Sequence, residues 1–231
     1  MKQLSESIRK KVSKNLLAEQ IYDVLFDLIV KNELKPGDRM NIEGVSKQLN
    51  VSRSPVAAAF SALERDGFLI ILPQNGTFVR ELTYAELDAI YIARAALERV
   101  VAAFAVKEVD ARELLTYKVR FDSYKNAREL SEESMLSLFE LEAKLHDFLA
   151  GFVPDIVRRE YVNICNLTRR SRLLNLKHEL ANSDISEMMK NNVEIHVQII
   201  NAFVGKKLDR CIALLEKDVL YTRDNVLSYL Y

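Results

Sequence analysis

The sequence predicts a mainly α-helical protein of two domains, the first with a short β-hairpin and the second an all-α antiparallel helical bundle. Only 6 Gly and 4 Pro interrupt the 231 residues, which favours long helices. Apolar residues make up 49% of the chain and recur at steps of three and four. A strand-like pattern is confined to residues 68–79. The chain is therefore long and apolar enough to bury a core in each domain.

The first domain opens with two helical patterns separated by a turn. Residues 15–31 place apolar side chains, Val24 among them, along one face of a helix. The Lys-Pro-Gly-Asp sequence at 35–38 is a turn signal, because Pro fixes φ and Gly accepts positive φ. Asn41 suits the N-cap of a short second helix, and Asn50 suits its end.

A third helix and a hairpin follow. Ser52 or Ser54 can cap the helix, which Gly67 closes. Residues 68–72 and 77–79 then read as two strands joined by a Pro-Gln-Asn-Gly turn. Three short helices followed by a two-stranded hairpin are typical of a winged helix-turn-helix.

No strand pattern is found after Thr83. A capping box, formed by that threonine and Glu86, indicates a domain boundary near 80–82. We therefore expect a winged helix-turn-helix domain with an N-terminal arm at 1–81 and an all-helical domain at 82–231. The helical segments expected in the second domain are 84–107, 109–127, 132–152, 155–178, 182–204 and 206–230.

Composition also limits the class of protein. Cys165 and Cys211 have no Cys-x-x-Cys partner, which disfavours a disulfide framework or a cysteine zinc finger. The amino terminus lacks an apolar signal core, and no run of about 18 apolar residues could span a bilayer. We expect a soluble, cytoplasmic protein with no membrane partner.

The net charge is zero, but it is unevenly distributed. Residues 1–80 contain 12 Lys and Arg against 9 Asp and Glu, and the remaining residues contain 21 against 24. The basic N-terminal domain is the candidate for a phosphate-bearing partner, although a net charge of this size alone is equally compatible with an ordinary surface.

The third helix is the candidate reader of double-stranded DNA, because such a helix fits a major groove about 12 Å wide. Its start combines hydroxyls, free backbone N–H groups and the positive end of the helix dipole, all suited to phosphate. The hairpin tip can approach the neighbouring backbone or minor groove. The alternative is that these side chains are only solvated surface groups. The candidate DNA-binding residues are Lys47, Ser52, Arg53, Ser54, Asn75, Gly76 and Thr77.

These residues carry a family resemblance. The run PGDRM…VSKQLNVSRSPVAAAFSALERDGFLIILPQNGTFV resembles the DNA-binding domain of GntR-family bacterial transcription regulators. The resemblance implies an operator-binding homodimer. In the family, the Ser-Arg-Thr-Pro-Val segment is usually followed by Arg-Glu-Ala-Leu, whose arginine commonly contacts DNA. This chain has Ala57, Ala58, Ala59 and Phe60 there, which places more of the recognition on Arg53.

Residues 84–230 resemble the all-helical FCD domain of the FadR-type GntR subfamily. That resemblance rests on YIARAALERVVAAFAV, LEAKLHDFL, EIHVQIINAF and CIALLEKDV. Many subfamily members bind a divalent metal through an aspartate, a histidine four residues later and two further histidines. Glu142, His146, His196 and Asp218 take the corresponding positions here, so two of the four depart from the pattern.

The first two candidate ligands share one helix face, because four residues advance a helix by about 400° and leave Glu142 and His146 only about 40° apart. With His196 and Asp218 they form a set suited to Zn²⁺, Ni²⁺, Mn²⁺ or Fe²⁺. The alternative is two hydrogen-bonded interior histidines, two surface carboxylates and an effector cavity without metal.

Arg94 falls where an effector-binding arginine often lies in this subfamily, and small carboxylates are the effectors that the resemblance implies. A guanidinium can hold a carboxylate through two hydrogen bonds. The alternative is that Arg94 and Glu98 form an i,i+4 ion pair on the helix surface.

Three functions follow from these observations. The first is a homodimeric, metabolite-responsive transcription regulator, expected to be a repressor and not an enzyme, which binds operator DNA and a small carboxylate. The second is a metalloenzyme that uses the Glu, His, His and Asp cluster to activate water. The third is a helical interaction protein whose hairpin is only structural. No separate nucleophile or acid–base pair is apparent, which favours the regulator.

Overall fold

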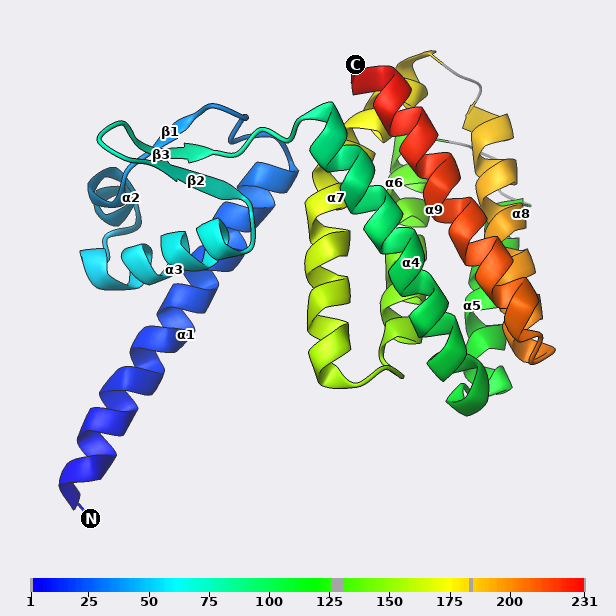
Figure 1. Ribbon diagram of the computed structural model, residues 1–231, viewed down its shortest axis with the longest axis horizontal. Coiled ribbons are helices and arrows are strands. Elements are labelled where there is room, and N and C mark those ends of the chain that lie inside the picture. Colours follow the sequence, from blue (N-terminus) through cyan, green and yellow to red (C-terminus); the bar gives the residue numbers. More distant parts are fainter. Residues whose placement is uncertain (1, 126–130, 183–184, 231) are drawn as a thin grey trace. The chain divides into compact units, whose positions relative to one another are not determined.

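The computed structural model describes residues 2–125, 131–182 and 185–230. The chain divides into two compact units, Met1–Thr83 and Tyr84–Tyr231 (Figure 1). Helices dominate both units, and the described strands all belong to one small sheet in the first unit, so the predicted fold class is confirmed.

The N-terminal unit is a winged helix-turn-helix. Its helices are α1 (Lys2–Val30), α2 (Ile42–Leu49) and α3 (Arg53–Arg65), and its strands are β1 (Arg39–Met40), β2 (Leu69–Leu72) and β3 (Gly76–Val79). The strands form an antiparallel sheet of order β1-β3-β2, in which Leu69 lies opposite Val79. The predicted hairpin is thus confirmed. Strand β1 was not predicted, because a strand of two residues leaves no pattern in the sequence, and α1 begins at Lys2, earlier than the predicted start near residue 15.

The core of this unit lies between α1 and α3, which pack against each other. Ile21, Leu25 and Phe26 of α1 are buried, and the ring of Phe26 meets Phe68 edge-on with centroids 5.1 Å apart. Val24, which was predicted to face inward, is half-exposed. The reason is that the contact with Phe68 draws the buried arc of α1 toward Phe26 and away from Val24. On α3 the buried residues are Pro55, Val56, Ala59, Phe60 and Leu63.

Local signals fix the turn between α2 and α3. The Asn41 side chain accepts a hydrogen bond from the backbone N–H of Gly44 at 2.6 Å, which confirms the predicted N-cap. Asn50 ends α2 in the left-handed region, with φ of 53°, as its place in the turn predicted. Gly67 follows α3 with φ of 89° and starts the chain toward β2. These ends direct the start of α3 out of the domain, toward solvent.

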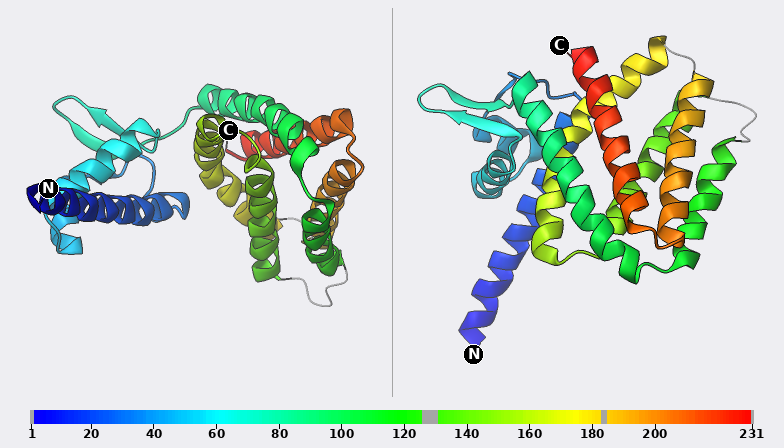
Figure 2. Two further views of the ribbon diagram at one scale, coloured as in Figure 1. Left: turned by 90° about the horizontal axis from the view of Figure 1, so that it is seen from below. Right: turned by 45° about the vertical axis from the view of Figure 1, so that its right-hand side comes forward.

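The C-terminal unit is a helical bundle (Figure 2). The ends of its helices differ from the predicted segments by at most four residues, and the end predicted at 127 lies outside the described residues. Helix α4 packs against α6, α7 and α9, while α5 packs against α6 and α8. The helices are α4 (Tyr84–Glu108), α5 (Ala111–Lys125), α6 (Glu132–Ala150), α7 (Asp155–Asn182), α8 (Ile185–Val204) and α9 (Leu208–Leu230). One continuous apolar core fills the bundle, with Leu141, Leu145 and Leu149 of α6 in its interior.

Two further expectations concern the class of protein. Cys165 and Cys211 are free thiols, the first partly and the second fully buried. Within the described residues, no helix is both long and apolar enough to cross a bilayer.

Candidate functional site

The start of α3 is exposed and polar. Arg53 is the first residue of the helix, with Ser52 at the N-cap and Ser54 immediately after it, and all three are exposed. The Ser52 side chain makes no capping hydrogen bond, so its hydroxyl and the first N–H groups of α3 remain available to another acceptor or donor. A guanidinium, two hydroxyls and a helix N-terminus together suit a phosphate backbone.

A carboxylate that the sequence analysis missed lies between two of the predicted DNA-binding cations. The Oε1 atom of Glu43 is 3.0 Å from Nζ of Lys47 and 3.3 Å from a terminal guanidinium nitrogen of Arg53. The i,i+4 spacing of Glu43 and Lys47 was a usable signal. The contact with Arg53 was not predictable, because it depends on the angle between α2 and α3.

The hairpin tip carries the other predicted DNA-binding residues. Asn75 is exposed, Thr77 is half-buried, and Gly76 has φ of 116°, a region that disfavours any side chain. A Cβ atom on Gly76 would lie 3.2 Å from Nε of Arg39, so the Arg39 guanidinium rests against the tip. Arg39 lies on β1, and it adds a cation to the wing that the sequence analysis missed.

Small side chains occupy the middle of α3. Ala57 is half-buried and Ala58 is exposed, and neither methyl group can form a hydrogen bond with a base edge. Within residues 53–58, Arg53 and Ser54 are therefore the side chains that can form a hydrogen bond with a base edge.

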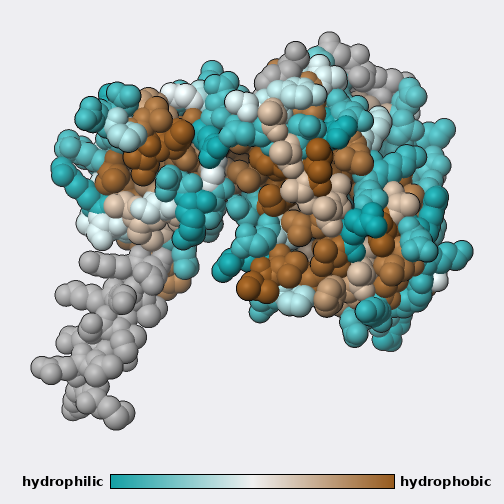
Figure 3. Space-filling model, in the orientation of Figure 1, coloured by the Kyte–Doolittle hydropathy of each residue, from teal (hydrophilic) through white to brown (hydrophobic). Residues whose placement is uncertain are grey.

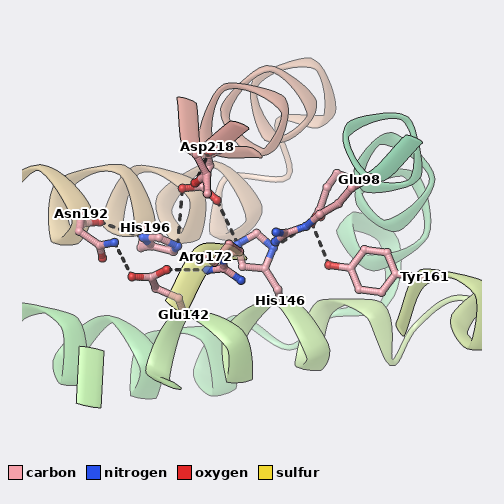
Figure 4. Close-up of polar contacts among 10 residues, drawn as sticks. Glu98, Glu142, His146, Tyr161, Arg172, Asn192, His196 and Asp218 are labelled. Carbon is pink, nitrogen blue, oxygen red and sulfur yellow. Dashed lines mark hydrogen bonds and ion pairs between the residues drawn. The ribbon is translucent and has the colours of Figure 1, made fainter. Parts of the chain in front are cut away.

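In the second unit, three of the four predicted metal ligands come together (Figure 4). His146 lies on α6, His196 on α8 and Asp218 on α9, and their candidate ligand atoms all lie within 4.8 Å of one another. The Nε2 atom of His146 is 3.4 Å from Oδ2 of Asp218, and Nε2 of His196 is 4.0 Å from Oδ1 of the same carboxylate. Both histidines are buried.

Glu142, the fourth predicted ligand, is not part of this group. Its Oε2 atom accepts a hydrogen bond from Arg172 at 3.1 Å, and its Oε1 atom accepts one from the side-chain amide of Asn192. The Arg172 guanidinium in turn lies over the ring of Phe139, 4.7 Å from its centroid. The i,i+4 spacing did place Glu142 on the same helix face as His146, but spacing could not show that α7 and α8 supply partners for it.

His196 has a free ring nitrogen in a buried place. Its Nδ1 atom lies 2.8 Å from the backbone carbonyl oxygen of Asn192, which can only accept, so Nδ1 carries the proton. In the neutral imidazole the lone pair is then on Nε2, which has no hydrogen-bond partner among the described residues. A buried lone pair beside a carboxylate fits a metal ion, since a cation would satisfy both.

His146 lies between two carboxylates. Its Nδ1 atom is 3.0 Å from Oε1 of Glu98, on the side of the ring opposite Asp218. Burial alone would lower the pKa of His146, but the charges of Glu98 and Asp218 outweigh it and raise the pKa to about 9. Burial would raise the pKa of Asp218, but the surrounding histidines and Arg94 outweigh this effect, so the pKa of Asp218 is lowered. A metal at this site would therefore replace a proton on His146.

Arg94, the predicted effector-binding residue, is buried on α4. Its Nε atom is 3.8 Å from Oε1 of Glu98, so the i,i+4 ion pair exists, but the alternative that it lies on the helix surface is wrong. Burial would lower the pKa of Arg94, but negative charge on its neighbours raises it, and the guanidinium stays charged. The i,i+4 spacing predicted the pairing of Glu98 with Arg94 but not a place for Glu98 in the site.

A cavity of about 620 Å³ opens beside the cluster. Residues of α6, α7, α8 and α9 line it, among them Glu142, Arg172, Asn192 and Asp218. Arg94 is not among the lining residues. The volume suits a small organic molecule, and Asp218, a member of the cluster with His146 and His196, lies on the cavity wall.

Comparison with known proteins finds similarity mainly in the first unit. Residues 17–79 match the gntR family of bacterial regulatory proteins. The chain is 32% identical over 133 residues to an HTH-type transcriptional regulator, YdhC, of Bacillus subtilis, and 30% identical over 131 residues to the HTH-type transcriptional repressor RspR of Escherichia coli. These alignments span 58% and 57% of this chain, and only 59% and 57% of the relatives.

A longer but weaker alignment covers both units. It relates 87% of the chain to 90% of the Nta operon transcriptional regulator of Aminobacter aminovorans at 25% identity. Among solved structures, the Escherichia coli protein McbR/YncC has the same fold, with a TM-score of 0.72 at 19% identity over 93% of this chain and 98% of that one. A GntR transcriptional regulator from Rhodococcus sp. RHA1 gives 0.67 at 18% identity over the same shares.

The relatives are named as transcriptional regulators, which does not favour the metalloenzyme alternative. The matched residues run from within α1 to the last residue of β3, so they span the winged helix and end before the bundle. Residues 17–79, which form this winged helix-turn-helix, are therefore the part of the chain that is similar to the gntR family of bacterial regulatory proteins.

Proposed function

We propose that the protein is a metabolite-responsive transcription regulator that binds an operator duplex as a homodimer and represses transcription. The observation that carries this proposal is the exposed start of α3, where Arg53 and two serine hydroxyls face solvent within a GntR-family domain. Repression is supported by one relative, RspR, which is named a transcriptional repressor.

The DNA-binding step follows from the shape and charge of the N-terminal unit. Helix α3 enters the major groove, Arg53 contacts a guanine edge or a phosphate, and Lys47 contacts the backbone. The wing, with Asn75 at its tip and Arg39 beside it, contacts the adjacent backbone or minor groove.

This step is tested by selecting binding sequences from random duplex DNA with the intact protein and measuring affinity at fixed salt. Arg53→Ala should weaken binding by about tenfold or more, because a good base contact is worth about 1–3 kcal/mol. Arg65→Ala is the matched control, since Arg65 is an exposed arginine at the far end of α3 that pairs with Asp66. Equal affinity of the Arg53→Ala protein and the wild type would refute the recognition-helix proposal.

The second unit is proposed to hold a divalent metal through His146, His196 and Asp218. Two imidazoles and one carboxylate suit Zn²⁺, Ni²⁺, Mn²⁺ or Fe²⁺, and three protein ligands leave a position open to another molecule. Elemental analysis of protein purified without chelator tests this. Replacing both His146 and His196 by Ala should abolish the bound metal, whereas His178→Ala, which changes an exposed histidine outside the cluster, should retain it. Equal metal in all three proteins would exclude these ligands.

The charge of the site favours an anionic effector once a metal is present. Glu98, Glu142 and Asp218 supply three negative charges, and Arg94 and Arg172 supply two positive ones. A divalent cation on neutral histidines leaves the group with a net positive charge, which attracts a small carboxylate entering from the cavity. Buried Arg94 contributes to that charge, and its Nε atom has no hydrogen-bond partner within the described chain.

The effector proposal predicts that metal and carboxylate binding are coupled. A panel of small sugar acids and dicarboxylates can be screened by thermal unfolding against metal-loaded and metal-stripped protein. A true effector should stabilise the loaded form more strongly, because the open metal position adds to its affinity. A carboxylate that stabilises both forms equally would show that the metal plays no part in effector binding.

A further inference from the structure

We propose that Glu98 is the positioning residue of the metal centre, which holds His146 in the tautomer and orientation that direct Nε2 toward Asp218 and His196. The proposal rests on the metal centre proposed above. It assigns a role to a buried carboxylate of α4, outside the predicted ligand set, that would otherwise have no place in the site (Figure 4).

The hydrogen bonds of Glu98 determine the tautomer. The Oε1 atom of Glu98 accepts from the Tyr161 hydroxyl at 2.8 Å and lies 3.0 Å from Nδ1 of His146. An ionised carboxylate can only accept, so Nδ1 donates, and the lone pair of the neutral ring is on Nε2. That atom faces Asp218 at 3.4 Å. A histidine held by a carboxylate on one nitrogen is oriented to bind a metal through the other.

The two histidines of the cluster are held in the same way by different partners. His196 donates from Nδ1 to the backbone carbonyl of Asn192 and stacks on Phe121 with centroids 5.0 Å apart. In His146 the partner of Nδ1 is the Glu98 carboxylate in place of a backbone carbonyl. The His146 ring lies at 81° to the His196 ring. A side chain thus fixes one ring and the backbone fixes the other, so only the first can be tested by substitution.

Glu98 is kept in an environment that is unfavourable for a charge. The side chain is 0% exposed in the centre of the bundle, and its Oε2 atom has no hydrogen-bond partner among the residues described. Burial of a carboxylate that is not fully hydrogen-bonded reduces stability relative to an apolar residue of similar size. Arg94 on the preceding turn, 3.8 Å away, offsets the charge. This arrangement is expected of a group that orients a ligand and is not explained by packing.

Glu98 is not itself a ligand in this geometry. The atoms that lie within 4.8 Å of one another belong to His146, His196 and Asp218, and Glu98 contacts His146 from the opposite edge of the ring. Its effect on the metal therefore passes through the imidazole.

The test compares two buried carboxylates of the same cluster. Glu98→Gln keeps the shape but offers an amide to His146, which can present an N–H and force the proton onto Nε2. Glu142→Gln is the matched control, with the same change of charge at a side chain that contacts Arg172 and Asn192 but neither histidine. Zn²⁺ affinity is measured by competition with a chromogenic chelator on the stripped, intact protein, and Co²⁺ absorption reports the coordination.

Glu98→Gln should weaken Zn²⁺ binding by about 10–100-fold and change the Co²⁺ spectrum, whereas Glu142→Gln should stay within about threefold of the wild type. Nitrogen chemical shifts of His146 should show a protonated Nδ1 in the wild type above pH 9. Unchanged affinity in Glu98→Gln would overturn the proposal. Equal losses in both variants would also overturn it, because total charge and not the contact with His146 would then govern affinity.

A further variant keeps the test decisive if Glu98→Gln does not fold. Tyr161→Phe removes one hydrogen bond to Oε1 and leaves the carboxylate, so it should weaken Zn²⁺ binding by a few-fold, and an unchanged affinity would contradict the proposal. Failure of the wild-type protein to bind any metal would instead refute the metal centre. The two failures are therefore distinguishable.

Discussion

Glu43 determines how much positive charge the start of α3 presents. Both Lys47 and Arg53 direct their charges to its Oε1 atom, and all three side chains are exposed. Exposed ion pairs are worth about 0–1 kcal/mol each, so DNA phosphate can displace the carboxylate. The carboxylate nevertheless competes with phosphate and repels it. We therefore expect Glu43 to weaken the proposed DNA binding.

Glu43→Gln should raise the affinity for duplex DNA by about two- to tenfold at low salt, because two cations are released and one negative charge is removed. The gain should shrink as salt increases. Fluorescence anisotropy with a labelled duplex measures both effects. Glu33→Gln, which makes the same change of charge on an exposed residue after α1, is the control. A loss of affinity in Glu43→Gln would show that the carboxylate helps to position Arg53.

His146 makes the stability of the metal-free protein depend on pH. Its pKa of about 9 in the folded state lies above the ordinary value of 6.5, so the folded state holds the proton more tightly. The stabilisation is complete below pH 6.5 and is lost as the pH rises through 9. Urea unfolding of chelator-treated protein measures this effect at about pH 6 and about pH 9.5. Between these two pH values, the free energy of unfolding should fall more in the wild type than in His146→Gln. Equal losses would contradict this assignment.

At the scale of elements, the ends of α2 and α3 were predictable because each depends on neighbours in the chain. The amide of Asn41, the left-handed Asn50 and Gly67 act within their own turns. The helices of the bundle were predictable for the same reason, since apolar periodicity is local. The partners of Glu142 were not, because Arg172 and Asn192 reach it from α7 and α8. Sequence spacing shows which residues share a face of a helix, but it does not show which residues of other helices pack against that face.

The cap of α2 can be tested within the intact chain. Asn41→Ala removes the hydrogen bond to the Gly44 N–H and should destabilise α2 by about 0.5–2 kcal/mol. Hydrogen exchange followed by mass spectrometry should show faster exchange in residues 42–49. Asn41→Ser, which retains a capping oxygen, should exchange almost as slowly as the wild type. Unchanged protection in Asn41→Ala would mean that packing alone holds the helix.

At the scale of the molecule, the C-terminal unit supports the proposed homodimer. Hydrophobic residues are exposed on the face of the bundle seen in Figure 3. On α4, Ile92 is 51% exposed and Phe104 is 42% exposed. Exposed apolar side chains along one helix are typical of a surface that a partner covers. Because operator half-sites are read in pairs, dimerisation through α4 would join the two copies of α3 that such an operator requires.

Sedimentation velocity tests this surface. Replacing Ile92 and Phe104 together by Glu should convert the dimer to a monomer, because two charges would be buried at the interface. Val119→Glu, at a 70% exposed position on α5, should leave the dimer intact. Dimers in both proteins would exclude α4 as the interface, and a monomeric wild type would exclude the homodimer.

Site-specific photo-crosslinking is the most direct test of whether α3 and the wing contact the DNA. A photoreactive amino acid is placed at Ser54 on the exposed side of α3, at Asn75 on the wing, or at Ser123 on α5 of the second unit. With an operator duplex selected by the intact protein, the first two positions should crosslink to DNA and Ser123 should not. Crosslinks from Ser123 with none from Ser54 and Asn75 would contradict the account.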